Sequence, residues 1–145
     1  MAMLKRLSCS SLIAVLVLAA VVPVALASRP ASRSQSRAIT RAVRTTTVAS
    51  VNKVPAREYR VTGIKITTLP SARNGAWAIA QITPTGRFKN TLQGATVILV
   101  RSAGTSIWTA IDVGTSEVGC GATPNAVLQD LYGQSGDVCP PGSGV

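Results

Sequence analysis

Two runs of β-forming residues joined by a short loop, residues 96–100 (TVILV) and 107–113 (IWTAIDV), constrain the fold most strongly. Residues of this kind suit a pleated, buried surface. The loop at residues 102–106 contains Gly104, as hairpin loops commonly do. The first run is apolar on both faces, which predicts a strand inside a sheet. Because a lone hairpin is only marginally stable in water, the rest of the chain must supply partners.

Alternation within these and two earlier runs predicts which side chains share a face. In the second run of the hairpin, Ile107, Ile111 and Val113 alternate with Trp108, Ala110 and Asp112. Residues 77–83 form another expected strand, with Trp77 and Ile79 on one face and the small residues Ala76, Ala78 and Ala80, together with Ile82, on the other. The alanines leave room for a helix to lie close to that face.

Residues 59–66 (YRVTGIKI) are predicted to form a strand in which the apolar residues switch from odd to even positions. Tyr59 and Val61 share one parity, whereas Ile64 and Ile66 share the other. A β-bulge at Thr62 and Gly63 would bring both pairs to one face.

Two helices are expected, one before the strands and one after them. From residue 36, with Ser36 as the N-cap, an apolar stripe predicts a helix that ends near the threonines at 45–47; the stripe comprises Ala38, Ile39, Ala42 and Val43. The second helix has Thr123 as its N-cap, Pro124 at its first position and Gly133 at its end; its stripe comprises Val127, Leu128 and Leu131.

The expected order is therefore helix, four strands and short helix, an α+β fold. Every connection between strands is too short for a helical crossover, so the sheet should be an antiparallel meander. We expect the N-terminal helix to pack on the curved face of this sheet, an arrangement analogous to cystatin-like and NTF2-like folds. The analogy concerns architecture alone and carries no function.

The N-terminus has the three parts of a secretory signal peptide. Lys5 and Arg6 precede an apolar run at residues 12–27, which ends in an A-x-A site, so we expect cleavage before Ser28. A membrane anchor is the alternative, but the run is shorter than the ~20 residues of a spanning helix and contains Pro23. The expected organisation is a signal peptide (1–27), a flexible basic segment (28–35), one domain (36–139) and a frayed tail (140–145), with no membrane span after cleavage.

Removal of Lys5 and Arg6 lowers the net charge from +10 to +8. Such a charge favours anionic partners, and it equally serves solubility outside the cell. Removal of Cys9 leaves two cysteines, Cys120 and Cys139, in an oxidising compartment, where we expect them to form a disulfide.

Five arginines, and no acidic residue, lie within residues 28–44: Arg29, Arg33, Arg37, Arg41 and Arg44. They could contact an anion, or they could simply form the solvent-exposed face of a helix. The stretch contains no aromatic residue, so no specific nucleic acid is indicated. The expected partner is an anionic cell-wall polymer or another extracellular protein.

The sequence offers little catalytic chemistry. It contains no histidine, which removes the usual general base and metal ligand, and it has no motif for a metal or cofactor. We therefore expect a non-enzymatic binding or structural module, a class that includes extracellular inhibitors. The alternative is a small ligand-pocket protein or hydrolase of NTF2-like type that uses Asp112 or Glu117, although each carboxylate is more typical of a partner for arginine.

Several segments, namely YRVTGIKITT, WAIAQITP, GATVILVRS and WTAIDVGTSEVGC with a final cysteine, resemble those of small exported proteins from high-GC Gram-positive (actinobacterial) bacteria. The resemblance covers residues 36–139. It implies export and an α+β fold, and it implies no activity and no site residues.

Overall fold

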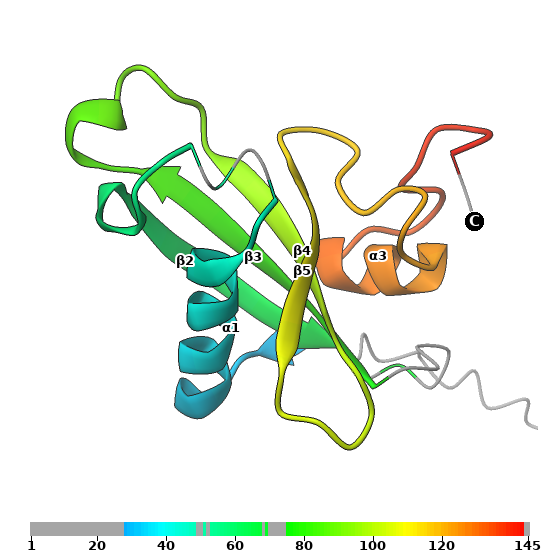
Figure 1. The fold of residues 1–145 in the computed structure, drawn as a ribbon. Coiled ribbons are helices and arrows are strands. Elements are labelled where there is room, and N and C mark those ends of the chain that lie inside the picture. The colour runs from blue at the N-terminus through cyan, green and yellow to red at the C-terminus, as the bar shows by residue number, and fades with distance from the viewer. Residues whose placement is uncertain (1–27, 49–50, 52, 68, 70–74, 144–145) are drawn as a thin grey trace, which may run out of the picture.

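The computed structural model describes residues 28–48, 51, 53–67, 69 and 75–143. The predicted signal peptide lies outside the described residues. The described part has an α+β fold with a five-stranded antiparallel sheet and two α-helices (Figure 1). The strands are β1 (Arg29–Pro30), β2 (Tyr59–Thr67), β3 (Ala76–Pro84), β4 (Ala95–Arg101) and β5 (Trp108–Gly114). The helices are α1 (Arg33–Thr45) and α3 (Asn125–Tyr132), with 3-10 turns η1 (Ala56–Glu58) and η2 (Gly86–Phe88).

The strands follow one another in the sheet in chain order, as the predicted meander requires. The prediction of four strands was wrong, because β1 adds a fifth at the edge beside β2. Arg29 and Pro30 pair with Ile66 and Lys65, and the amide of Ala31 donates to Ile64 O at 3.2 Å. The segment expected to be flexible is therefore an edge strand followed by the first turn of α1. An edge position tolerates proline, which has no N–H to donate to a ladder.

Helix α1 begins at Arg33, earlier than predicted, because Ser32 and not Ser36 is its N-cap. The amide of Gln35 donates to Ser32 Oγ at 3.3 Å, and the amide of Ser32 donates to Gln35 Oε1 at 3.0 Å. This reciprocal pair is a capping box, which satisfies two amides that have no partner within the helix. The helix ends at Thr45, where the threonines were expected to end it.

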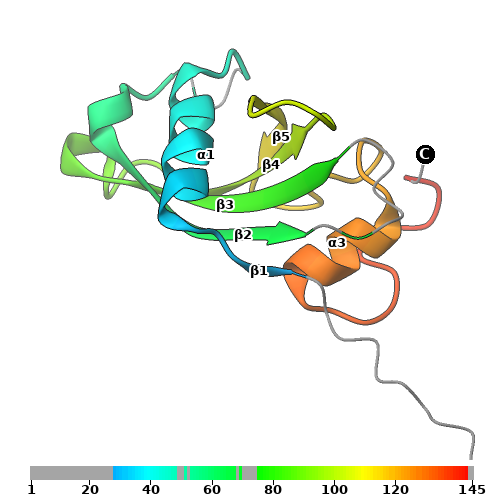
Figure 2. The ribbon, with the colours of Figure 1, turned by 90° about the horizontal axis from the view of Figure 1, so that it is seen from below.

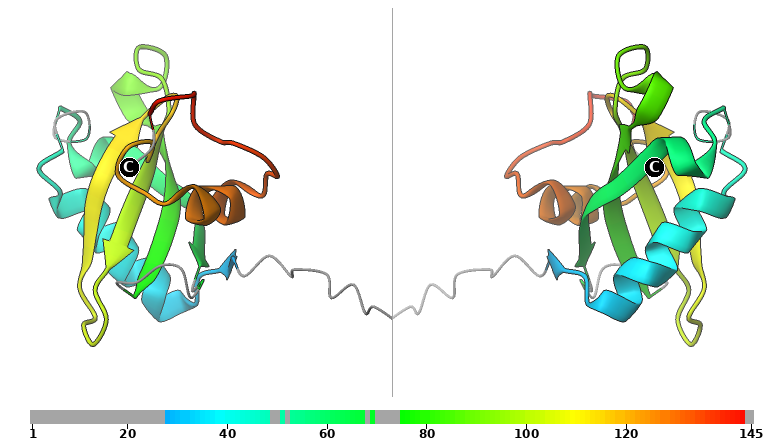
Figure 3. Two further views of the ribbon diagram at one scale, coloured as in Figure 1. Left: turned by 90° about the vertical axis from the view of Figure 1, so that its right-hand side faces the viewer. Right: turned by 90° about the vertical axis from the view of Figure 1, so that its left-hand side faces the viewer.

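The two helices lie on opposite faces of the sheet (Figures 2 and 3). On one face, the fully buried Ile39 and Val43 of α1 belong to a core cluster with Ala76, Ala78 and Ala80. This confirms that the alanine face of β3 receives a helix. On the other face, the apolar side of α3 belongs to a second cluster with Trp77, Ile79 and Ile98. Strand β4 contributes to both clusters, as its two apolar faces predicted.

Two bulges change the phase of the sheet. The pairing of β2 with β3 shifts between Thr62 and Lys65, where Gly63 has a φ of 60°, so the predicted bulge is confirmed. A second bulge was not predicted. Leu99 pairs with Ala110 and Ile98 with Asp112, so Ile111 is the extra residue.

The second bulge makes the predicted faces of β5 wrong. Val113 joins Trp108 and Ala110 in the α1 cluster, whereas Ile111 packs against the α3 cluster. Ile107 precedes the strand and is 71% exposed. A bulge of this kind reverses every side chain beyond it.

The C-terminal region is tied together by the predicted disulfide between Cys120 and Cys139, whose Cα atoms are 5.6 Å apart. Helix α3 lies within this loop and ends, as predicted, at Gly133 in the left-handed conformation (φ 69°). The predicted N-cap was wrong: the cap is Pro124, whose carbonyl accepts from Val127 N and Leu128 N. Thr123 is buried just before it, and its hydroxyl has no hydrogen-bond partner in the described part of the chain.

Residues 140–143 of the predicted tail form a turn that the amide of Ser143 closes onto Pro140 O at 3.2 Å. Among the helices of the described ranges, none combines the length and the apolar character that crossing a membrane requires.

Candidate functional site

The exposed side of α1 carries four arginines, Arg33, Arg37, Arg41 and Arg44, which we call the arginine face. At 3.6 residues per turn their spacing confines them to an arc of about 80° and a length of about 16 Å along the helix. All four are exposed, and the hydroxyl-bearing residues Ser36, Thr40 and Thr45 lie beside them in a shallow depression. The fifth candidate, Arg29, is also exposed but lies on β1 and not on this face.

Among the residues that the structure describes, no acidic side chain forms an ion pair with the arginine face. Within the described residues the one ion pair joins Arg57 Nε to Glu58 Oε1 at 3.9 Å, and it involves no arginine of α1. The opposite side of the helix is fixed by Ile39 and Val43, each 0% exposed. The sheet therefore holds four guanidinium groups of like charge on one rigid stripe, and an anion could contact several of them at once.

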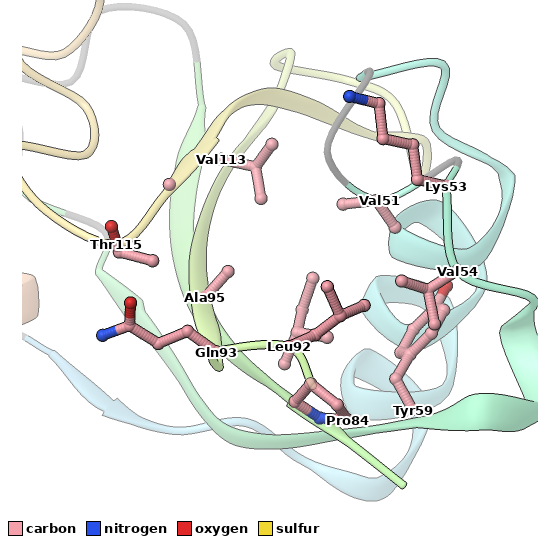
Figure 4. Close-up of a pocket in the computed structure, with 12 residues that line it drawn as sticks. Val51, Lys53, Val54, Tyr59, Pro84, Leu92, Gln93, Ala95, Val113 and Thr115 are labelled. Carbon is pink, nitrogen blue, oxygen red and sulfur yellow. The ribbon is translucent and has the colours of Figure 1, made fainter. Parts of the chain in front are cut away.

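A cavity of about 410 Å³ lies on the α1 side of the sheet, beside the segment that follows α1 (Figure 4). Its walls are mostly apolar and come from the segment after α1, from β2, β3 and β5, and from the loop before β4; they include Val51, Val54, Ile82, Pro84, Leu92 and Val113. This volume lies within the range of pockets for small ligands. The sequence left open a ligand pocket with Asp112 or Glu117, but it did not predict the residues that line this cavity, because they come from segments that are separate in sequence.

Four polar side chains also line this cavity: Lys53, Tyr59, Gln93 and Thr115. Lys53, Gln93 and Thr115 are exposed and so lie toward solvent, with Lys53 across the cavity from Gln93 and Thr115 (Figure 4). Tyr59 is buried, and burial raises the pKa of its phenol above the usual value of 10 while the nearby charge of Arg44 opposes that rise. The phenol is therefore neutral at physiological pH and can act as a hydrogen-bond donor.

Asp112 and Glu117, the two carboxylates considered for catalysis, do not line this cavity. Asp112 Oδ1 accepts from Val113 N at 2.8 Å, and Asp112 Oδ2 accepts from Gly119 N at 2.6 Å. The carboxylate thus fastens the loop after β5 onto the α3 side of the sheet. Glu117 is exposed in that loop with a φ of 53°, and its carbonyl accepts from Cys120 N. The structure brings neither carboxylate together with Tyr59.

In the described ranges, no group of three or more His, Cys, Asp or Glu side chains is arranged to hold a metal ion. Comparison of the chain with protein-family models, with curated proteins and with solved structures found no match.

Proposed function

We propose that this protein is exported, loses residues 1–27, and attaches to an anionic cell-wall polymer through the arginine face without catalysing a reaction. The unneutralised stripe of four arginines on α1 carries the proposal. Side chains one turn apart lie about 6 Å from each other at the helix surface, so one linear polyanion can pass over several of them. The Cys120–Cys139 disulfide and the signal-peptide pattern support an extracellular site of action.

The structure changes how this proposal must be tested. Removal of residues 28–44 would delete Ile39 and Val43 from the core. A truncated chain could therefore lose binding because it no longer folds, and its loss of binding would not test the arginine face. Substitution of the four arginines by glutamine keeps an unbranched polar side chain of similar helix propensity at these positions and removes their charge. We expect the quadruple variant to bind immobilised polyphosphate, or purified cell wall, at least about a hundredfold more weakly than the unchanged protein at low salt.

A matched variant controls for net charge. Arg57, Arg60, Lys65 and Arg87 are exposed basic residues outside the arginine face, and their replacement by glutamine removes the same four charges. This variant should keep most of the binding. If both quadruple variants lose equal affinity, net charge and not the arginine face attracts the polymer. If neither loses affinity, the proposed attachment is wrong.

The cavity beside Tyr59 supports a second candidate function, the binding of a small amphipathic ligand. This function corresponds to the ligand-pocket alternative of NTF2-like type, but neither Asp112 nor Glu117 lines the cavity. Apolar walls would hold the body of such a ligand, and Lys53 would pair with an anionic head. A fluorescent fatty acid is a suitable probe. Val113→Trp should abolish its binding by filling the cavity, and Lys53→Gln should weaken it about tenfold. Binding unchanged by Val113→Trp would show that the probe sits elsewhere.

A further inference from the structure

Ser28, the first residue after the expected cleavage site, is joined to a carboxylate far away in the sequence. Its backbone nitrogen donates to Asp130 Oδ1 at 3.0 Å, and its hydroxyl donates to Asp130 O at 2.9 Å. The two residues are separated by 102 positions. The nitrogen that cleavage would convert into the new N-terminus therefore already lies against a side chain of α3.

Asp130 is an unusual residue for this position. It is 3% exposed, and its Oδ2 is buried without a hydrogen-bond partner among the described residues. In this part of the chain no basic side chain forms an ion pair with it. A buried carboxylate normally has a positively charged partner or a full set of donors, because its desolvation is costly. Among the described residues, one amide N–H and no cation contact this carboxylate, which leaves it incompletely satisfied there.

Cleavage would supply what is missing. Hydrolysis of the peptide bond between Ala27 and Ser28 consumes one water, leaves a carboxylate on Ala27 and frees the amine of Ser28, which carries the released proton as an ammonium group. An α-amino group has a pKa near 8 and is mostly protonated at neutral pH. It then offers three N–H donors and a positive charge where the amide offered one donor.

We propose that removal of the signal peptide creates a structural ion pair between the α-ammonium of Ser28 and Asp130, which stabilises the mature protein relative to its precursor. The position of Ser28 is fixed on both sides of this contact. Strand β1 pairs Arg29 with Ile66, and α3 lies beside β1 (Figure 2). The inference rests on the cleavage site of the proposed function, but not on attachment through the arginine face.

A double-mutant cycle of four purified chains tests the ion pair, and none of the chains has to be secreted. Residues 28–145, which carry every described element, are made with a free amine at Ser28. A second chain keeps the native residues 25–27, so that Ser28 N remains an amide. Both are made with Asp130 and with Asp130→Asn. With Asp130, we expect the extended chain to melt about 5–10 °C lower, as loss of one partner of a buried pair should cause. With Asp130→Asn, the difference should fall below about 2 °C.

Equal melting temperatures of the two Asp130 chains would overturn the proposal, and so would an equal difference in both backgrounds. If Asp130→Asn does not fold, acylation of the free amine decides instead. In the folded chain that begins at Ser28, acetic anhydride should modify the α-amine at least tenfold more slowly than in the chain unfolded in urea, and equal rates would overturn the ion pair. N-terminal sequencing of secreted protein separately tests the cleavage site, so the two claims can fail independently.

Discussion

The two helices are attached to the same sheet in different ways. Helix α3 is held by the disulfide that spans it, by large side chains such as Trp77 and Ile98, and by Asp130. Helix α1 meets small alanines, is held by apolar contact, and turns its four arginines outward. The α3 face is thus held by a disulfide and by buried hydrogen bonds, whereas the α1 face has a cavity and arginines without acidic partners among the described residues. We therefore propose that the α1 face is the one that binds a partner, whereas the α3 face serves mainly to stabilise the fold.

Among the variants that compare the two faces, the largest stability effect should come from Gly119, where the loop after β5 meets α3. Its φ is +93°, and a Cβ there would lie 2.7 Å from Leu128 Cδ2. Gly119→Ala adds backbone strain to overpacking and should cost about 3–4 kcal/mol of unfolding free energy. Gly136 is a matched control, because its φ is +97° but a Cβ would meet nothing within 4 Å. Gly136→Ala should cost about 1 kcal/mol. Urea denaturation of both variants measures the difference, and equal losses would contradict close packing at Gly119.

Removal of the disulfide should have the next largest effect. Replacement of Cys120 and Cys139 by serine opens a loop with a sequence separation of 19. The chain-entropy model then predicts a loss of about 3 kcal/mol of unfolding free energy. Urea denaturation of the oxidised protein and the double variant measures it. A change below about 1 kcal/mol would show that α3 needs no covalent tie and would weaken the contrast between the faces.

Asp112→Asn should lower the free energy of unfolding by about 2 kcal/mol. The carboxylate accepts hydrogen bonds from two backbone N–H groups, whereas the amide of asparagine has a single oxygen, which is a weaker acceptor. Glu117→Gln, in the exposed part of the same loop, should change stability by less than about 0.5 kcal/mol. Thermal unfolding of the two variants checks this. Equal effects would mean that Asp112 does not fasten the loop.

Alkaline pH should produce the smallest effect, through the buried Tyr59 on the α1 face and the half-buried Tyr132 on the α3 face. Burial raises the pKa of both Tyr59 and Tyr132, with the charge of Asp112 adding to the rise at Tyr132. Because the folded pKa exceeds the unfolded value of about 10, the neutral phenols stabilise the fold fully below pH 10, and this contribution is lost as the pH rises through the folded pKa.

Stability measured from pH 8 to 11 should therefore decline less steeply in Tyr59→Phe and in Tyr132→Phe than in the unchanged protein. At neutral pH only Tyr132→Phe should lose stability, by about 1 kcal/mol, since the Tyr132 hydroxyl donates to Val118 O at 3.0 Å. An unchanged alkaline profile in both variants would contradict the raised pKa values.

Local patterns in the sequence predicted most of the fold. The change of parity at Gly63 indicated the first bulge, and the alanines of β3 indicated the helix above them. The bulge at Ile111 left no such trace, because residues 107–113 alternate as a regular strand would. Strand β1 is too short to show a pattern, and it contains Pro30. The early start of α1 could have been found, since Ser32 and Gln35 have the spacing of a capping box.

The sites were harder to predict than the fold. The arginines were visible as a cluster, but the absence of a neutralising acid around them depends on where the folded chain places its carboxylates. The cavity depends on how the segment after α1 and the loop before β4 pack against β2, β3 and β5, which are separate in sequence. The contact of Ser28 with Asp130 joins the first described residue to the last helix, and nothing in either local sequence indicates it.

The division of roles between the faces can be tested by measuring melting temperature and polyphosphate retention on two variants side by side. The variant with glutamine at the four positions of the arginine face should keep the melting temperature within about 2 °C and lose retention. The variant with serine in place of Cys120 and Cys139 should melt at least about 5 °C lower and, below its melting temperature, keep full retention. Loss of retention by the disulfide variant while it is still folded, or full retention by the arginine variant, would contradict this division of roles.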